Sequence, residues 1–460
     1  MIPIFEKGSK TESKNYRPIS LLPLFSIIIE RVIHDQTLSF LDTNQILYGY
    51  QSGFRRNFST NSCLSYLHDL ITKGFDSGMY TGMILIDLQK AFDTIDHKIL
   101  LHKMQFFGFS EKVIKWYKCY LSERTFQVKV NERFSSSGNV TCGVPQGSIL
   151  GPLLFLLYVN DMAQSVDSKL LLYADDSCII IQDKDPKNIE KKLNKDFSNL
   201  CNWFIENKLS IHLGEDKTKS ILFASKRKLN KGNQIKIVHG NVEIKQHSTV
   251  SYLGCILDET LSGESMALNV INKINSKLKF LYRKNKFLTP HLKRMLSNAL
   301  IQPHFDYACA AWYPQLTLNL KKRIQVVQNK CIRFCLDLEN TAHIGYKEFE
   351  KINWLNTSDR FLQCLCSTAF KFIKGKCPEY MNEVFQIAHQ SNMTTRSSYL
   401  KLSHPFRKTN MGQKNLSFLA PKEWNKLPME IKVCSSINIF KHRVKSFFLN
   451  LLKLHETNSY

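Results

Sequence analysis

Two adjacent aspartates between two short apolar segments constrain the fold of this chain more than any other feature. Residues 170–174 and 177–181 are apolar, and only Asp175 and Asp176 separate them. Two such segments joined by a two-residue turn are typical of a tight β-hairpin. The sequence therefore predicts a hairpin with two carboxylates at its tip.

A third carboxylate follows another apolar segment. Residues 83–86 form a continuous apolar run that ends at Asp87, which is typical of a central strand buried on both faces of a sheet. Rigid, converging carboxylates can hold two divalent ions about 3.5–4 Å apart, and magnesium prefers such oxygen ligands. Asp87, Asp175 and Asp176 are thus candidate catalytic and metal-binding residues. The alternative is a strand-end cap at Asp87 and an ordinary turn pair at the hairpin.

The chain carries a large excess of positive charge. Among 460 residues, 63 are Lys or Arg and 39 are Asp or Glu, which gives a formal net charge of +24. Such an excess suits a polyanionic partner, because each phosphate that is neutralised releases counterions. A generally basic soluble protein has the same composition, so charge alone does not decide between them.

Length and apolar patterning bound the class of protein. A chain of 460 residues predicts two or three packed units. Its 13 cysteines form no tight framework, which indicates reduced thiols inside a cell. The apolar runs are too short to span a bilayer and no secretory signal is visible, so we expect an intracellular protein without a membrane partner.

Hydrophobic periodicity predicts an α+β region followed by a mostly helical one. The basic region after residue 265 is predicted to be helical, and residues 388–420 irregular. We expect the helix over 24–41 to pack on a neighbouring unit through its apolar face. Predicted helices cover 24–41, 60–73, 98–107, 111–121, 149–162, 187–208, 291–310, 318–336 and 357–374; predicted strands cover 83–86, 126–130 paired with 140–142, 170–174, 177–181, 221–223 and 250–256.

Short motifs follow one another over nearly the whole chain. They are Asn15–Leu22, Gln51–Arg55, Ile86–His97, Gly143–Pro152, Leu172–Asp176, Asn207–Ser210, Lys217–Thr218, Tyr252–Gly254 and Pro421–Pro428. Each is weak alone. In this order they resemble the motifs of reverse transcriptases from non-LTR (LINE-type, jockey-like) retrotransposons. Glu6 and Gln89 depart from the family pattern, at positions away from the predicted metal ligands.

The resemblance implies an α+β right-hand polymerase fold with a helical C-terminal region. Residues 1–80 would form partial fingers and residues 81–257 the palm, with 1–257 together forming the reverse transcriptase domain. Residues 258–340 would form a helical thumb. The role of residues 341–460, which are predicted to be helical, stays open.

The resemblance also implies roles for the acidic residues and their neighbours. Asp87 and Asp175 would bind both metal ions, Mg²⁺ or alternatively Mn²⁺, with Asp176 as a supporting carboxylate. The backbone at Leu88 would help to hold the triphosphate. Phe92 would act as a steric gate that rejects a ribose 2′-hydroxyl, unless it is an ordinary core aromatic residue.

Further roles concern the nucleotide and the primer. Arg17 would contact the triphosphate, and Lys7 is a weaker candidate for the same duty. Gln146 and Gly147 would approach the incoming nucleotide and the template. Lys217 would lie beside the active site, as a general acid toward pyrophosphate. The hairpin Tyr252, Leu253 and Gly254 would grip the primer.

These implications together predict an RNA-directed DNA polymerase. It would add dNTPs by two-metal nucleotidyl transfer to a DNA primer on an RNA template, with an RNA–DNA hybrid as product, in the nucleus and cytoplasm. Because the first fingers motif begins by residue 15, we expect no endonuclease in cis. One alternative is a catalytically silent nucleic-acid-binding remnant. Another, an RNA-templated RNA polymerase or a palm-fold cyclase, is disfavoured by Phe92.

Overall fold

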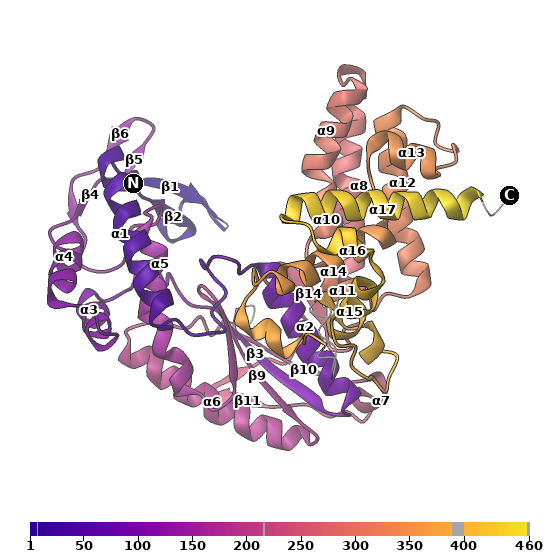
Figure 1. Cartoon of the computed structure of the whole chain (residues 1–460). Helices are drawn as coiled ribbons and strands as arrows, with labels where there is room; N and C mark the ends of the chain where they lie inside the picture. Colours follow the sequence, from indigo (N-terminus) through magenta and orange to yellow (C-terminus); the bar gives the residue numbers. More distant parts are fainter. Residues whose placement is uncertain (7, 215–216, 389–399, 458–460) are drawn as a thin grey trace.

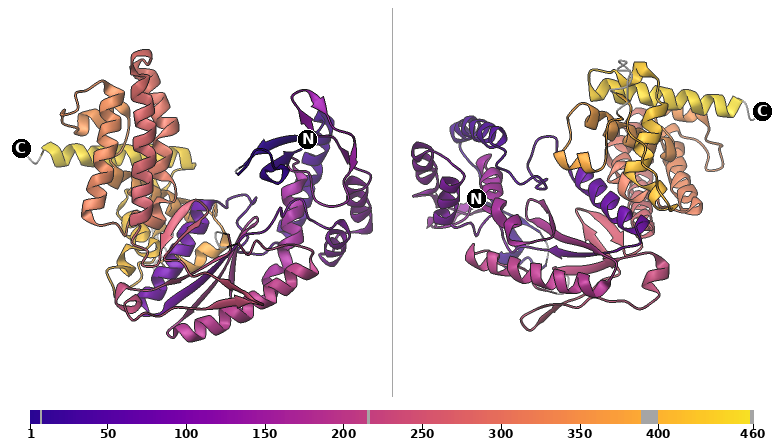
Figure 2. Two further views of the ribbon diagram at one scale, coloured as in Figure 1. Left: turned by 180° about the vertical axis from the view of Figure 1, so that it is seen from behind. Right: turned by 60° about the horizontal axis from the view of Figure 1, so that its bottom comes forward.

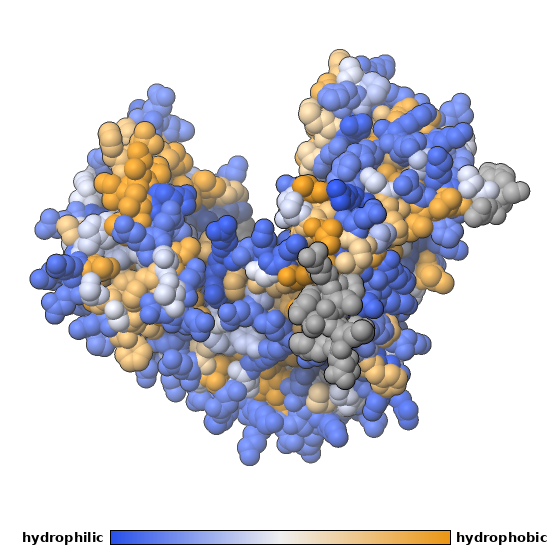
Figure 3. Space-filling view, viewed as in Figure 1, coloured by the Kyte–Doolittle hydropathy of each residue, from blue (hydrophilic) through white to orange (hydrophobic). Residues whose placement is uncertain are grey.

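Two arms rise from a central antiparallel sheet and enclose a hollow between them (Figures 1, 2 and 3). This computed structural model describes residues 1–6, 8–214, 217–388 and 400–457. The N-terminus lies in one arm and the C-terminus in the other (Figure 1). The mixture of helices and sheet confirms the α+β class.

The central sheet contains β3 (Tyr80–Ile86), β8 (Lys169–Tyr173), β9 (Asp176–Asp183) and β10 (Lys219–Phe223) in the order β10-β3-β9-β8. All of these strands pair antiparallel. The predicted central strand and the predicted hairpin are confirmed. Within the β3–β9 pair, Ile86 lies opposite Ser177, so the residue after β3 emerges beside the start of β9.

Both faces of the sheet are buried, each against a different hydrophobic core. Met83 and Leu85 of β3 face the core that includes α2 (Thr60–Asp76). Ile84 and Ile86 face the other core, with α5 (Leu150–Val159) and α6 (Pro186–Glu206). This explains why β3 reads as a continuous apolar run rather than an alternating one. The Ile189 side chain of α6 occupies the space that a Cβ at position 82 would need, so only glycine fits there.

The first arm is built from two stretches of sequence (Figures 1 and 2). The first stretch forms β1 (Ile2–Phe5), a short 3-10 turn (Ser13–Asn15), β2 (Tyr16–Ile19) and α1 (Leu24–Thr43). The second forms two helices and two small ribbons: α3 (His97–Phe106), α4 (Glu111–Leu121), β4 (Thr125–Phe126) with β7 (Gly138–Asn139), and β5 (Lys129–Val130) with β6 (Arg133–Phe134).

Three expectations in this arm were wrong in detail. The strand predicted over 126–130 is divided, because β4 pairs with β7 while β5 turns back at Asn131 and Glu132 to pair with β6. The predicted partner 140–142 forms no strand. The helix predicted over 149–162 continues from Val159 as a 3-10 turn (Asn160–Ser165). The apolar side chains of α1 do not all pack: Phe25 is 79% exposed.

The second arm is helical and is formed by the described residues from α8 onward (Figures 1 and 2). Three predicted helices are confirmed as α8 (Glu264–Arg283), α12 (Leu318–Leu336) and α14 (Thr357–Ile373). The single helix predicted over 291–310 was wrong, because the chain there forms α9 (Pro290–Leu300), α10 (Gln302–Asp306) and α11 (Cys309–Trp312). Pro303 begins the second piece and Ala308, with φ +50°, precedes the third.

Several elements had not been predicted. Residues 388–420 were expected to be irregular. Residues 389–399 lie outside the described residues, and α15 begins at Leu416, before the end of the expected irregular segment. The unpredicted elements include β1 and β2 of the first arm, α7 (Lys226–Leu229), β11 (Ile237–His239), β12 (Val242–Ile244) and a 3-10 turn (Asn285–Phe287). Residues 341–460 were predicted to be helical without bounds for every helix, and the described part of that region contains, besides α14, the elements α13 (Tyr346–Ile352), η4 (Glu379–Glu383), η6 (Gly412–Lys414), α15 (Leu416–Lys426), α16 (Met429–Lys432) and α17 (Ile437–Thr457). Within the described ranges, no helix is both long and apolar enough to cross a membrane.

One buried carboxylate ties the first arm to the sheet. Glu30 of α1 is 1% exposed. Its Oε2 accepts hydrogen bonds from the backbone N–H groups of Ile149 (2.7 Å) and Leu150 (3.4 Å), and its Oε1 accepts one from the Tyr120 hydroxyl (2.8 Å). A negative charge at the first turn of α5 also matches the helix dipole. Glu30 therefore fixes the start of α5 directly after the segment Gly143–Ser148.

Glu30→Ala should lower the free energy of unfolding by about 2 kcal/mol, because it leaves buried N–H groups of α5 without an acceptor. The measurement is urea unfolding followed by circular dichroism. Asp42→Ala, an exposed position on the same helix, is the matched control and should change stability by less than about 0.5 kcal/mol. Equal unfolding curves for the two variants would refute this role of Glu30.

Candidate active site

The sheet brings the predicted carboxylates together at one end of its central strands. Asp87 directly follows β3, and Asp176 begins β9 opposite Tyr173. A pocket of about 430 Å³ opens there. It is lined by Leu85, Ile86, Asp87, Asp176, Ser177, Lys217, Lys219, Ser251, Tyr252 and Leu253. Residues predicted from separate motifs thus meet around a single pocket.

Desolvation and neighbouring negative charge raise the pKa of Asp175 and Asp176. The Asp176 side chain reaches solvent, yet desolvation by the surrounding chain, followed by the negative charges of Asp175 and Asp87, raises its pKa to about 6. Desolvation also raises the pKa of Asp175; the charge of Asp87 adds to this rise, and those of Arg17 and Lys217 oppose it. Such clustered acids favour a bound cation, which would relieve their repulsion.

A lysine forms an ion pair with one of these carboxylates. Lys217 Nζ donates a hydrogen bond to Asp87 Oδ2 at 2.7 Å. Among the residues that the structure describes, no three His, Cys, Asp or Glu side chains are grouped closely enough to hold an ion. Asp87 and Asp176 nevertheless face one pocket and offer the oxygen ligands that Mg²⁺ prefers. The residues present therefore fit a divalent ion. In the structure the Lys217 ammonium group is bound to Asp87 Oδ2, an oxygen that such an ion would use.

The motif Asn207–Ser210 supports the backbone beside Asp87. His212 N donates to Asp87 O (2.9 Å) and Gln89 N donates to Ser210 O (2.8 Å). These bonds form a short antiparallel bridge between Leu88 and Ile211. The two hydrogen bonds of this bridge do not involve the backbone N–H of Leu88.

Phe92 lies in a cluster of aromatic rings. Its half-buried ring stacks on Phe155 of α5 with centroids 4.6 Å apart and meets Phe54 edge-on at 6.1 Å. The motif Gln51–Arg55, which contains Phe54, thereby contacts the segment after Asp87. These contacts fix the position of the ring that the sequence predicts as a steric gate.

The segment around Gln146 and Gly147 lies between the two stretches of the first arm. Gln146 Nε2 donates to Asp93 Oδ1 (2.8 Å), and Gln146 O accepts from Ser20 N (2.8 Å). Gly147 has φ +104°, and a Cβ there would lie 3.0 Å from Ser20 O. Only glycine adopts this conformation without strain.

Arg17 projects from β2 with its side chain largely exposed and forms an ion pair with Glu6. Its charge lowers the pKa of both Asp175 and Asp93, although desolvation outweighs it at each. Arg17 therefore acts on the same electrostatic region as the carboxylates. Lys7, the other predicted basic candidate, lies outside the described residues.

The predicted primer-grip residues form the turn of a hairpin between β13 (Thr249–Tyr252) and β14 (Cys255–Asp258). Leu253 (φ +46°) and Gly254 (φ +74°) both adopt the left-handed conformation of a tight two-residue turn. The Tyr252 ring is 3% exposed. The Tyr307 hydroxyl of the second arm donates to Leu253 O, so this turn joins the pocket to the helical arm.

Gln51 is a site residue that sequence reasoning missed. Its Oε1 accepts hydrogen bonds from Gly53 N (2.8 Å) and Ala174 N (3.0 Å). Ala174, with φ +57°, directly precedes the two aspartates. Gln51 belongs to a motif recognised in the sequence, but the motif does not reveal that this side chain crosses to the aspartate turn.

Comparison with known proteins adds a family to this geometry. The family model described as "Reverse transcriptase (RNA-dependent DNA polymerase)" matches residues 6–257, more than half of the chain. The right-hand polymerase fold predicted from the motifs is thereby confirmed.

Similar proteins come from mobile elements of Drosophila melanogaster. A probable RNA-directed DNA polymerase from transposon X-element is 29% identical over 77% of this chain and 40% of that protein. The corresponding protein from transposon BS is 28% identical over 73% and 38%. The RNA-directed DNA polymerase from mobile element jockey is 27% identical over 72% and 37%. The chain thus spans less than half the length of these relatives, and its predicted resemblance to jockey-like elements is confirmed.

Among solved structures, apo telomerase from Candida tropicalis is 15% identical, with a TM-score of 0.36 over 75% of this chain and 59% of that one. The family assignment rests on residues 6–257, which include every predicted active-site residue. This chain belongs to the reverse transcriptase family of RNA-dependent DNA polymerases.

Proposed function

We propose that this chain catalyses RNA-directed DNA synthesis for a non-LTR retrotransposon, with Asp87, Asp175 and Asp176 as its catalytic carboxylates. One observation carries the proposal: carboxylates from two paired strands, Lys217 and the 252–254 turn meet at one pocket. We assign residues 1–80 to partial fingers, 81–257 to the palm, 258–340 to the thumb and 341–460 to a helical C-terminal region.

Asp87, Asp175 and Asp176 would hold the divalent ions, Mg²⁺ or Mn²⁺. When bound, such ions stabilise the charge that develops on the attacking and leaving oxygens of an in-line displacement. Lys217 would leave Asp87 and donate a proton toward the departing pyrophosphate. The 2.7 Å ion pair between Lys217 and Asp87 supports this role, because it places a proton donor at the carboxylate cluster.

The incoming dNTP would lie between the first arm and the carboxylates. Arg17 would bind its phosphates, since a guanidinium group matches phosphate oxygens. The Leu88 backbone would contact the triphosphate, and Gln146 with Gly147 would line the nucleotide and template side. Phe92 would select deoxynucleotides by a clash with the 2′-hydroxyl, and its packing on Phe155 and Phe54 supports this by limiting movement of the ring.

The RNA template and DNA primer would form a hybrid in the hollow between the arms (Figure 3). The turn at Tyr252, Leu253 and Gly254 would hold the primer end. Helix α8 carries Lys273, Lys277 and Lys279, whose charges suit the phosphates of a hybrid without reading its sequence. We also propose action in the nucleus and cytoplasm, since the proposed template is RNA and the proposed primer is DNA.

A catalytically silent remnant is the alternative function. It would retain the basic arms and bind the hybrid. The intact carboxylates favour catalysis, because three acids whose charges repel one another destabilise a fold that makes no use of them.

Asp175→Asn together with Asp176→Asn should reduce primer extension on an RNA template by at least about a thousandfold, because the divalent ions lose their ligands. The measurement is incorporation of dNTPs in Mg²⁺ by the wild-type chain and the double variant. Asp167→Asn, an exposed aspartate of the same region, is the control and should leave the rate unchanged. Hybrid binding without any extension by the wild type would instead establish the silent remnant.

Metal affinity should depend on pH through Asp176. Because its pKa is raised to about 6, Asp176 is protonated below that pH and ionised above it. Mn²⁺, used as a paramagnetic probe, should therefore bind more weakly below pH 6, by up to about tenfold per pH unit for each proton displaced. The measurement is Mn²⁺ titration between pH 5 and pH 7.5. Asp176→Asn should flatten the profile near pH 6, and an unchanged profile would contradict this assignment.

Phe92→Ala should increase ribonucleotide use relative to deoxynucleotide use by about 100-fold, the effect of removing a clash worth ~3 kcal/mol. The measurement is the ratio of kcat/KM for a ribonucleotide and its deoxynucleotide. Phe106→Ala makes the same change at a ring that is 79% exposed and should leave the ratio unchanged. If Phe92→Ala lowers both values equally, the ring serves packing alone.

A further inference from the structure

The turn that presents the two aspartates contains a strained residue. Ala174 has φ +57°, a left-handed conformation that strains a residue with a Cβ. Such a residue keeps its conformation only when its surroundings hold it there. The contacts that hold Ala174 are therefore contacts that position Asp175 and Asp176.

Residues 50–53 hold this turn directly. Gln51 Oε1 accepts from Ala174 N at 3.0 Å, and Gln51 is 2% exposed. The backbone on either side of Gln51 is bonded to β8: Leu172 N donates to Tyr50 O (3.1 Å) and Ser52 N donates to Leu172 O (2.7 Å). A Cβ at Gly53 would collide with the backbone of Ala174, so the two segments are packed backbone against backbone.

The C-terminal region in turn holds residues 50–53. The Tyr50 hydroxyl donates to Glu383 Oε1, and the Tyr50 ring stacks on Tyr380 with centroids 5.8 Å apart and planes at 7°. The hydroxyl groups of Ser52 and Tyr380 share a hydrogen bond of 3.0 Å. Residues more than 300 positions away along the chain thus contact both neighbours of Gln51.

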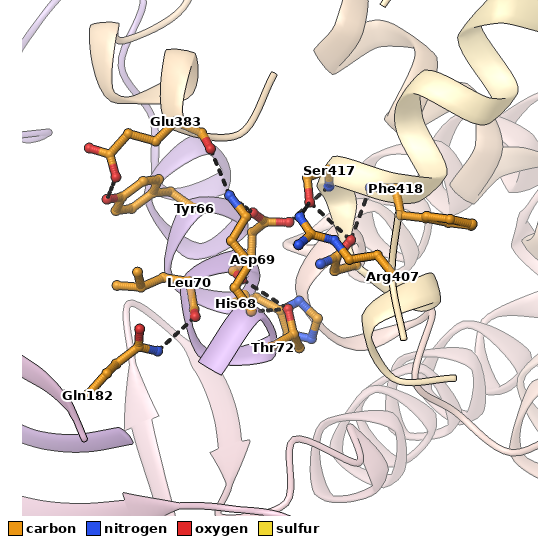
Figure 4. A network of polar contacts seen from close by, with 12 residues as sticks. Tyr66, His68, Asp69, Leu70, Thr72, Gln182, Glu383, Arg407, Ser417 and Phe418 are labelled. Atoms are coloured by element: carbon orange, nitrogen blue, oxygen red, sulfur yellow. Dashed lines mark hydrogen bonds and ion pairs between the residues drawn. The ribbon is translucent and has the colours of Figure 1, made fainter. Parts of the chain in front are cut away.

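Glu383 also anchors this contact to α2 and to β8. Its Oε2 accepts from the Tyr66 hydroxyl (2.6 Å) and from Lys169 Nζ (2.8 Å), and its backbone O accepts from Lys73 Nζ (2.7 Å). Figure 4 shows Glu383 joined to Tyr66 on α2. Desolvation opposes ionisation of Glu383, but the bonds from Lys169, Tyr50 and Tyr66 keep its pKa below the usual value.

A second contact on the same helix secures the C-terminal region. Asp69 Oδ1 accepts from Ser417 N at 2.9 Å, and Arg407 Nη2 donates to Ser417 Oγ at 2.8 Å (Figure 4). Farther along α2, Asp76 Oδ1 accepts from Thr409 N at 2.8 Å. Hydrogen bonds therefore join the C-terminal region to several positions along α2. They hold Glu383 and Tyr380 where both residues contact Tyr50.

We propose that residues 376–388 and 400–417 act as a positioning element for the polymerase site, in which Glu383 and Tyr380 fix Tyr50 and Ser52 so that Gln51 holds the aspartate turn. This inference rests on the proposed function for its catalytic consequence. Glu383 and Tyr380 are positioning residues, because neither lines the pocket at Asp87 and Asp176.

The test uses the full chain with Glu383→Ala, Tyr380→Phe and, as a matched control, Glu430→Ala at an exposed carboxylate on α16. Hydrogen exchange of the Ala174 amide should become at least about tenfold faster in Glu383→Ala, since this amide depends on Gln51 for protection. Tyr380→Phe, which keeps the ring and loses one hydroxyl, should show a smaller change in the same direction, and the control none.

Primer extension gives the second readout. Glu383→Ala should lower kcat by about 10- to 100-fold, as a displaced catalytic group does, with the KM for the hybrid unchanged. Combined with Gln51→Leu, it should reduce kcat by less than the product of the single effects, because both act through Ala174.

The outcomes separate the two proposals. A wild-type chain that fails to extend primers refutes the proposed function, and the exchange rate of Ala174 still decides the positioning role. Unchanged Ala174 exchange in a folded Glu383→Ala variant overturns the positioning role, as does an exact product of the kcat effects. If Glu383→Ala fails to fold, unchanged exchange and kcat in Tyr380→Phe overturn it instead.

Discussion

The antiparallel pairing of β3 with β9 is the constraint on which the site depends. Its register sets Ile86 opposite Ser177, so the carboxylate after one strand emerges beside the carboxylate at the start of the other. A shift of one residue would turn every side chain of the shifted strand to the opposite face of the sheet. Because both faces are packed against cores, such a shift would exchange side chains between the two cores and disrupt the packing of each. Complementary packing on both faces therefore fixes the spacing of the acids.

That spacing has a cost, and the surrounding chain offsets it. Desolvation, followed by the negative charge of neighbouring carboxylates, raises the pKa of Asp175 and Asp176. Lys217 opposes this rise at both aspartates and forms an ion pair with Asp87, and Arg17 opposes it at Asp175 through its charge alone.

The two arms contribute differently to this centre. The first arm supplies Arg17, Gln146 and Gly147, and Glu30 fastens it to the start of α5 by hydrogen bonds to buried N–H groups. The second arm reaches the centre through the turn at Leu253, which accepts a hydrogen bond from Tyr307. The C-terminal region joins α2 through Asp69, Asp76 and Glu383. Long-range polar contacts thus connect parts of the chain that local patterning keeps apart.

The sequence by itself determined the central hairpin, the strand before Asp87 and the main amphipathic helices, because apolar periodicity and turn chemistry are local properties. It also predicted, by resemblance, the family and the acids that meet at the pocket. The break at Pro303 is visible in the sequence, because proline interrupts a helix. Tertiary structure alone decided the left-handed Ala308, whose N donates to Asn61 Oδ1, and the division of the 126–130 strand, where Lys129 N donates to Met1 O. It alone revealed that Gln51 and Glu383 belong to one series of contacts that leads to Ala174. No periodicity records such contacts, because they join side chains more than 100 residues apart in the chain.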